Sequence, residues 1–248
     1  MAVEAWKRVI GSFLKNKDLN DGIDHSLKSD RWIRQQCWRD NPMISPFVNA
    51  QEKTGEGKPS YGLSSAGYDI RVGDTVMIPK SCMWNYQYKK KNDPTIYTVV
   101  PGHLRSSPVL APGGMVIVPD SFIHGDKNSK LEFHSYTDLE WIDIPPHTFA
   151  LGVSYETFNI PRNVTGICMG KSTIARAGLL VTVTPLEPEW NGFLTLEFFN
   201  TLPISYRLEP GNGITQLMFH EIEDGCEVSY ADRRGKYQGQ PASPITAR

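Results

Sequence analysis

Several signatures are missing from this chain, and each absence excludes a class of protein. The four cysteines form no C-x-x-C pair, and the six histidines form no H-x-x-x-H or H-x-E pattern. We therefore expect no zinc site, and the dispersed cysteines favour a reduced, cytoplasmic protein. No apolar run approaches the ~18 residues that a membrane-spanning helix needs.

An excess of charge of either sign is also missing. Lys and Arg number 26 against 27 Asp and Glu, which gives a formal net charge of −1. A surface that coats nucleic acid would need a clear excess of Lys and Arg, so we expect no nucleic-acid partner. With 248 residues, of which 40% are hydrophobic, the chain is long enough to bury one good core.

Two helical patterns open the sequence. In residues 3–16, apolar side chains recur at helical spacing between charges, which predicts an amphipathic helix that packs on the protein or on a partner subunit. The polar face of this helix is not strongly basic, which argues against binding to a membrane surface. The second pattern covers residues 29–40, with Ser29 at the N-cap position.

Short β-rich runs dominate the rest of the chain, separated by Gly and Pro about every ten residues. This pattern of short runs is typical of an antiparallel barrel or sandwich, so we expect a mainly β fold with N-terminal helices. Residues 1–25 would form a helical extension and 26–240 the β domain, with an elaborated loop or hairpin at about 85–120 and a flexible tail at 241–248. The runs are 67–78, 115–120, 139–144, 148–160, 166–170, 178–186, 192–200, 204–209 and 214–222.

The stretch GKSTIARAGL, residues 170–179, ends like a phosphate-binding loop but has the wrong spacing. A P-loop needs a glycine five residues before its Gly-Lys pair, and that position is Thr165. The polar side chains of the stretch still suit an oxyanion or a carboxylate. The alternative interpretation is an ordinary turn or helix start. These side chains are Lys171, Ser172, Thr173 and Arg176.

Glu197 lies in the apolar run FLTLEFF. Strand alternation places Thr195 and Glu197 on one face and Leu196 and Phe198 on the other. A carboxylate among large apolar side chains is costly to ionise, which favours a general base. The alternatives are a structural ion pair or a glutamate that faces water.

A third group of reactive side chains lies near the C-terminus, in SYADRRGKYQGQ. Taken alone, such a group is typical of solvated surface. Together with the two preceding stretches, it suggests a basic clamp for phosphates that closes over a buried carboxylate. Its members are Tyr230, Arg233, Arg234, Lys236, Tyr237 and Gln240.

At these residues the chain resembles the dCTP deaminase family of the dUTPase-like superfamily. The resemblance extends from about residue 26 to 240 and omits part of 85–120. It rests on four ordered blocks, which are far more specific than a single motif: MISPF (43–47), SYGLSSAGYDIR (60–71), GKSTIARAGLLVTVTPLEPEWNGFLTLEFFN (170–200) and CEVSYADRRGKYQGQ (226–240).

The resemblance implies a distorted β-barrel that assembles as a homotrimer with active sites between subunits. It implies hydrolysis of dCTP to dUTP and ammonia without zinc, which feeds the synthesis of dUTP, dUMP and dTTP. Mg²⁺ would arrive on the triphosphate rather than in a protein cage. Many relatives are inhibited by dTTP, through the turn around residues 182–185.

The resemblance also implies roles for individual residues. Glu197 would be the general base that activates water, and Ser172 and Arg176 would hold the water, the pyrimidine and the carboxylate in register. Many relatives have Arg at position 171 and Asp at position 187, so Lys171 keeps the charge without the bidentate fork of Arg, and Glu187 is longer by one methylene group. The implied binding residues are Lys171 and Thr173 at the phosphates, Thr184 and Pro185 over the base, Glu187 near the deoxyribose, and Tyr230, Lys236 and Gln240 in a C-terminal lid.

Three alternatives to a monofunctional deaminase stay open at this point. The first is a bifunctional deaminase and diphosphatase that continues to dUMP. The second is a plain dUTPase, which normally has an Asp and a Tyr where this chain reads LEPEWNGF. The third is a non-catalytic nucleotide-binding regulator of the same fold, against which the complete set of site residues argues.

Overall fold

The computed structural model describes residues 27–100, 106–111, 114–119 and 132–246, with only the backbone of the two short ranges described. The helix expected at 3–16 lies outside these ranges. The second expected helix is present as α2 (Asp30–Cys37), with Ser29 in extended conformation at its N-cap but without a side-chain capping bond. No helix in the described ranges is long and apolar enough to cross a membrane.

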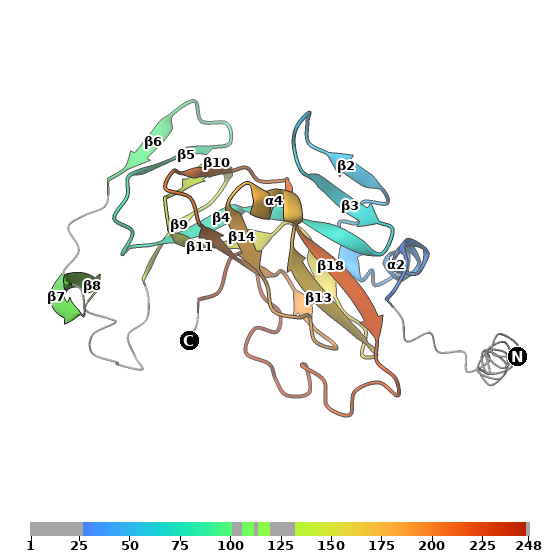
Figure 1. The fold of residues 1–248 in the computed structure, drawn as a ribbon. Helices are drawn as coiled ribbons and strands as arrows, with labels where there is room; N and C mark the ends of the chain where they lie inside the picture. The colour runs from blue at the N-terminus through green and yellow to red at the C-terminus, as the bar shows by residue number, and fades with distance from the viewer. Residues whose placement is uncertain (1–26, 101–105, 112–113, 120–131, 247–248) are drawn as a thin grey trace, which may run out of the picture.

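The fold is mainly β, as predicted, and each of the nine expected runs contains a strand (Figure 1). All the paired strands are antiparallel. The strands are β1 (Ile44–Ser45), β2 (Gln51–Lys53), β3 (Ser60–Ser64), β4 (Gly67–Pro79), β5 (Tyr86–Lys90), β6 (Ile96–Val99), β7 (Ser106–Ala111), β8 (Gly114–Pro119), β9 (Phe133–Tyr136), β10 (Leu139–Ile144), β11 (Phe149–Ser154), β12 (Thr157–Asn159), β13 (Val164–Gly170), β14 (Leu179–Thr182), β15 (Asn191–Gly192), β16 (Thr195–Asn200), β17 (Tyr206–Leu208) and β18 (Gly213–Glu221). A short helix, α4 (Ser172–Arg176), precedes β14.

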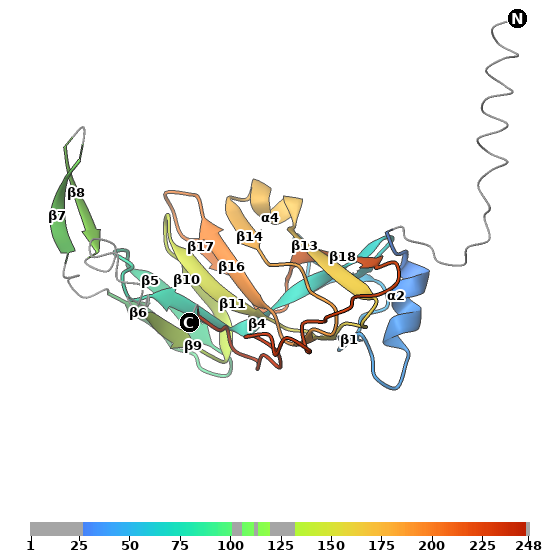
Figure 2. The ribbon, with the colours of Figure 1, turned by 90° about the horizontal axis from the view of Figure 1, so that it is seen from below.

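The largest sheet follows the path β13-β18-β4-β11-β16-β14, with β2, β3 and β9 attached beside β4. The long strand β4 joins two halves of this sheet, because residues 68–71 pair with β18 and residues 72–77 pair with β11. The sheet is strongly curled and makes a distorted, half-closed barrel (Figure 2). The strand that carries Glu197, β16, lies between β11 and β14 in this curl.

Three smaller sheets complete the fold. One has the order β17-β10-β5-β6, the second β1-β12-β15, and β7 pairs with β8 as a separate hairpin. The region expected to be elaborated, at about 85–120, thus contains the hairpins β5–β6 and β7–β8. Lys89 and Lys90 end strand β5, where Lys89 Nζ lies 2.7 Å from Glu140 Oε2 on β10.

One continuous hydrophobic core joins α2 and the sheets. Its largest fully buried side chains include Tyr68, Phe158, Phe198 and Phe219. Phe198 lies across Gly152 of the neighbouring strand, where an added Cβ atom would be 2.4 Å from Phe198 Cε2. Glycine at position 152 therefore leaves room for the ring of Phe198 against β11. Phe198 lies on the buried face of β16, and Glu197 lies on the opposite face.

Candidate active site

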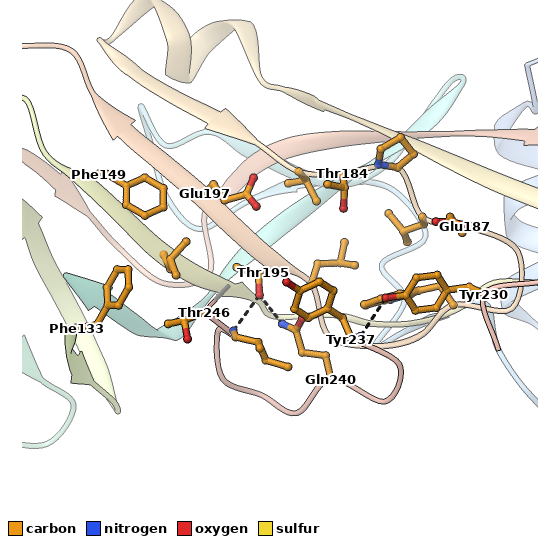
Figure 3. Close-up of a pocket in the computed structure, with 17 residues that line it drawn as sticks. Phe133, Phe149, Thr184, Glu187, Thr195, Glu197, Tyr230, Tyr237, Gln240 and Thr246 are labelled. Carbon is orange, nitrogen blue, oxygen red and sulfur yellow. Dashed lines mark hydrogen bonds between the residues drawn. The ribbon is translucent and has the colours of Figure 1, made fainter. Parts of the chain in front are cut away.

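A pocket of about 600 Å³ lies against the face of β16 that carries Glu197 (Figure 3). This volume falls within the ~300–1,000 Å³ that is usual for small-molecule sites. Strands β9, β11 and β16, the chain after β14 and the C-terminal segment form its walls. The lining residues are Phe133, Phe149, Leu151, Val183, Thr184, Pro185, Leu186, Glu187, Trp190, Leu194, Thr195, Glu197, Tyr230, Tyr237, Gln240, Ile245 and Thr246.

Glu197 is half-buried and points into this pocket, while its neighbours Leu196 and Phe198 are fully buried on the core side. The alternation expected from FLTLEFF is therefore confirmed. Glu197 pairs with Leu151 of β11 on one side and with Thr182 of β14 on the other. Thr182 Oγ1 donates a hydrogen bond of 2.9 Å to Glu197 Oε2. The carboxylate thus has one fixed oxygen and an apolar neighbour.

The turn after β14 forms the wall beside Glu197. Thr184 and Pro185 line the pocket there, as does Glu187, so all three predicted residues of this turn lie at the site. Glu187 is half-exposed and forms an ion pair with Arg233 of the C-terminal segment. The backbones of Gly166 and Leu186 exchange two hydrogen bonds, of 2.9 and 2.7 Å, which fix the turn on the main sheet.

The C-terminal segment closes another side of the pocket. Of the three predicted lid residues, Tyr230 and Gln240 line the pocket, and Lys236 is exposed, with its Nζ 5.2 Å from the centre of the Tyr237 ring. The Tyr237 N–H donates to Tyr230 Oη over 3.0 Å. The Tyr230 ring lies 5.3 Å from the ring of Trp190. The segment therefore contacts the pocket of its own chain.

The cluster in GKSTIARAGL lies elsewhere on the chain. Ser172, Thr173 and Arg176 are exposed on α4 and do not line the pocket. Helix α4 precedes the Leu179 end of β14, whereas Glu197 pairs with Thr182 at the other end, about 10 Å further along the strand. Within one chain, the structure does not bring Ser172 and Arg176 to Glu197.

Lys171 is directed into the protein. Its Nζ lies 2.7 Å from Asp69 Oδ2 and donates to Ser60 Oγ over 2.9 Å. Asp69 is buried and also accepts a 2.8 Å hydrogen bond from Gln51. In this arrangement the ammonium of Lys171 neutralises a buried carboxylate, so its predicted contact with phosphate would require the side chain to turn away from Asp69.

Several lining residues were not predicted from the sequence. Phe133 and Phe149, whose rings lie 6.3 Å apart, form an apolar end of the pocket, and Thr246 of the C-terminal segment adjoins it. Ile245 also lines the pocket. No local pattern connects these distant segments. Thr195 did carry a signal, because strand alternation places it on the same face as Glu197.

Basic side chains are missing from the pocket wall. Among the described residues that line it, none is Lys, Arg or His, and two are glutamates. A nucleoside triphosphate would need cations from beyond this wall. The indole Nε1 of Trp190 is a buried donor without a partner in the described part of the chain.

The described residues contain no group of three His, Cys, Asp or Glu side chains that could hold a metal ion. The four cysteines are free thiols, and none lines the pocket. Burial raises the pKa of the Cys37 thiol to about 12, so this sulfur keeps its proton near neutral pH.

Comparison with known proteins gives consistent matches. A family model described as dCTP deaminase-like matches residues 27–222, which include α4 and β16. The dCTP deaminases of Paracidovorax citrulli (strain AAC00-1) and of Acidithiobacillus ferrooxidans (strain ATCC 53993 / BNL-5-31) are each 42% identical over 217 residues, which cover 87% of this chain and 95% of theirs.

A solved structure, that of 2′-deoxycytidine 5′-triphosphate deaminase from Agrobacterium tumefaciens, is similar with a TM-score of 0.44 and 16% identity. The match covers 79% of this chain, and the chain spans 47% of that protein. The family model and the two 42% identical relatives span the strands that form the pocket. The chain therefore belongs to the dCTP deaminase-like family.

Proposed function

We propose that the protein hydrolyses dCTP to dUTP and ammonia, with Glu197 as the general base. The observation that carries this proposal is a half-buried carboxylate inside a nucleotide-sized pocket, held by the hydroxyl of Thr182. The relatives named dCTP deaminase support the choice of substrate, because they align over most of the chain.

The reaction needs one base that first accepts and then returns protons. Glu197 would take a proton from water, and the hydroxide would form a bond to C4 of cytosine. The carboxyl would then pass protons toward N3 and the departing amine, so that the C4–N bond breaks and ammonia leaves. A positioned acid–base group of this kind supplies ~10²–10⁴-fold in rate.

The walls of the pocket suggest how the nucleotide lies. The chain at Thr184 and Pro185 adjoins Glu197, so its backbone groups would read the amino edge of cytosine, and Glu187 would lie toward the deoxyribose. Tyr230 and Gln240 would cover the nucleotide from the C-terminal side. A dTTP molecule would inhibit by binding to the same pocket.

The charge of the pocket supports an assembled form. A triphosphate carries several negative charges, and the described lining residues include no basic side chain. Arg176, Ser172 and Thr173 are exposed on α4, where they are free to reach the pocket of a second copy. We therefore place the complete site between subunits of a homotrimer, with Lys236 and Arg233 at its rim.

Mg²⁺ would enter with the triphosphate and neutralise part of its charge. The one carboxylate that lines the pocket on the side of the lid, Glu187, is already paired with Arg233, so the phosphates themselves would supply most ligands of the ion, as is usual for Mg²⁺. The proposal includes no role for zinc. Dialysis against a zinc-selective chelator should leave ammonia release unchanged once Mg²⁺ is restored.

Incubation of the purified protein with dCTP and Mg²⁺ tests the function. Ammonia and dUTP without pyrophosphate support the proposal. Ammonia together with pyrophosphate and dUMP indicates the bifunctional enzyme. Pyrophosphate from added dUTP but no ammonia from dCTP indicates a dUTPase, and binding of dCTP without turnover indicates a regulator.

A further inference from the structure

The hydroxyl of Thr195 connects the catalytic strand to the C-terminal segment. Thr195 Oγ1 accepts a hydrogen bond from Gln240 Nε2 at 2.9 Å and another from the Ile245 backbone N–H at 3.1 Å (Figure 3). Thr195 is half-buried, lines the pocket and precedes Glu197 by two residues on the same face of β16. A single oxygen thus receives two donors from segments 45 and 50 residues away.

Backbone contacts hold the first part of this segment. The N–H of Gly239 donates to the carbonyl of Asn191 over 2.9 Å, and the N–H of Phe193 donates to the carbonyl of Gln240 over 3.0 Å. Gly192, with a φ of 124°, permits this approach, because an added Cβ atom would lie 2.5 Å from the Gln240 nitrogen. Residues 239–240 therefore stay in place without the hydroxyl of Thr195.

The segment after Gln240 depends on the hydroxyl. Among the described residues, the bond from Ile245 to Thr195 is the hydrogen bond that ties residues 241–246 to the rest of the chain. Pro244 is buried, Ile245 lines the pocket, and Thr246 lies beside Phe133 in the pocket wall (Figure 3). One side-chain oxygen therefore anchors this part of the wall, together with the packing of buried Pro244.

The same hydroxyl also determines how the amide of Gln240 is used. Gln240 is 4% exposed, so its amide cannot exchange partners freely with water. Because one N–H of Nε2 is bonded to Thr195, the second N–H and the carbonyl Oε1 remain for a nucleotide in the pocket.

We propose that Thr195 is a positioning residue for substrate binding: its hydroxyl holds residues 241–246 against the pocket and sets the amide of Gln240 toward the nucleotide. Thr195 does not take part in proton transfer, so its removal should affect the KM for dCTP rather than kcat. This inference rests on the proposed deamination of dCTP.

Two substitutions distinguish the effect of the Thr195 hydroxyl from the effect of its methyl group. Thr195→Val keeps the volume and the β-branch but removes the oxygen, and Thr195→Ser keeps the oxygen but removes the methyl group. Thr98→Val is the matched control, because Thr98 on β6 accepts a hydrogen bond of 3.1 Å from the Gln87 amide outside the pocket.

We expect Thr195→Val to raise the KM for dCTP about tenfold with kcat within about threefold of wild type, since the hydroxyl makes two hydrogen bonds. Thr195→Ser and Thr98→Val should keep the wild-type KM. Without any nucleotide, hydrogen exchange at the Ile245 amide should be at least about tenfold faster in Thr195→Val than in the other two variants.

The two readouts have separate meanings. A wild-type protein that releases no ammonia from dCTP contradicts the proposed function, while exchange at Ile245 still tests the tether. Wild-type exchange at Ile245 in Thr195→Val overturns the inference. An unchanged KM in Thr195→Val despite faster exchange also overturns the inference. An equal rise of KM in Thr195→Val and Thr195→Ser overturns it as well, because the rise would then come from packing and not from the hydroxyl.

Discussion

The hydroxyl of Thr182 donates a 2.9 Å hydrogen bond to Glu197 Oε2, and the two residues are direct partners in the pairing of β14 with β16. The bond crosses between adjacent strands, so the sheet itself sets its geometry. With Oε2 held in this way, Oε1 is the oxygen left to accept a proton from water. This contact orients the proposed base before any substrate arrives.

Removal of the Thr182 donor should therefore slow the chemical step. We expect Thr182→Val to lower kcat about tenfold, the effect of one lost hydrogen bond to a charged group, and to leave the KM for dCTP within about threefold. Thr182→Ser retains the oxygen and should keep most of the activity. The steady-state rate of ammonia release is measured for the wild type and both variants. A wild-type kcat in Thr182→Val would show that Glu197 does not need the hydrogen bond from Thr182.

The proposed site between subunits predicts complementation between inactive variants. Arg176→Ala and Glu197→Gln should each lose activity, because each would remove one half of the proposed shared site. In an equimolar mixture that is denatured and refolded together, about a quarter of the sites should combine Glu197 from one copy with Arg176 from another. Ammonia release from the mixture is the measurement.

The recovery of ammonia release should depend on the exchange of subunits between the two variants. The same two variants refolded separately and then assayed at once in one tube provide the control. If co-refolding restores no activity although the mixed oligomer forms, Arg176 does not serve the pocket of a neighbouring copy.

The Arg162–Asp232 pair predicts a pH dependence of stability. Asp232 Oδ2 lies 2.7 Å from Arg162 Nη2 and accepts the Ser229 N–H, and the hydrogen bond from Arg162 lowers the pKa of Asp232 to about 2. Because the pKa of Asp232 is lower in the folded than in the unfolded protein, ionised Asp232 stabilises the fold. This stabilisation is complete above about pH 4 and is lost as the pH falls toward 2.

Asp232→Asn removes this negative charge and keeps a side chain of similar size. The difference in urea midpoint between wild type and Asp232→Asn should be the same at pH 7 and pH 5 and smaller at pH 3. A difference that does not change at pH 3 would mean that Asp232 titrates near its ordinary pKa and that the pair with Arg162 is not maintained in solution.

Much of the fold could be predicted because strand alternation is a local property. The run around Glu197 has one buried and one less buried face, and that pattern alone gave the strand and the direction of the carboxylate. The helix at Asp30–Cys37 was predicted within residues 29–40, with Ser29 as its N-cap. Both features depend on residues close together in the chain.

The site itself could be predicted only in part, since its walls come from separate segments. Phe133, Phe149 and Thr246 lie toward one end of the pocket, and they come from distant segments to which no local motif points. Lys171 follows the motif, yet its ammonium is paired with buried Asp69, because the nearest uncompensated carboxylate attracts it. Arg176 is exposed on α4, away from Glu197 of its own chain, and its proposed role requires a second copy.

The most direct test of the account is the rate of ammonia release by Glu197→Gln at saturating dCTP. The amide cannot accept the proton of water, so we predict a fall in kcat of at least about 10²-fold, with dCTP still bound. Glu140→Gln, on β10 and paired with Lys89 outside the pocket, is the matched control and should keep the wild-type rate. A near-normal rate in Glu197→Gln would contradict the assignment of Glu197 as the base.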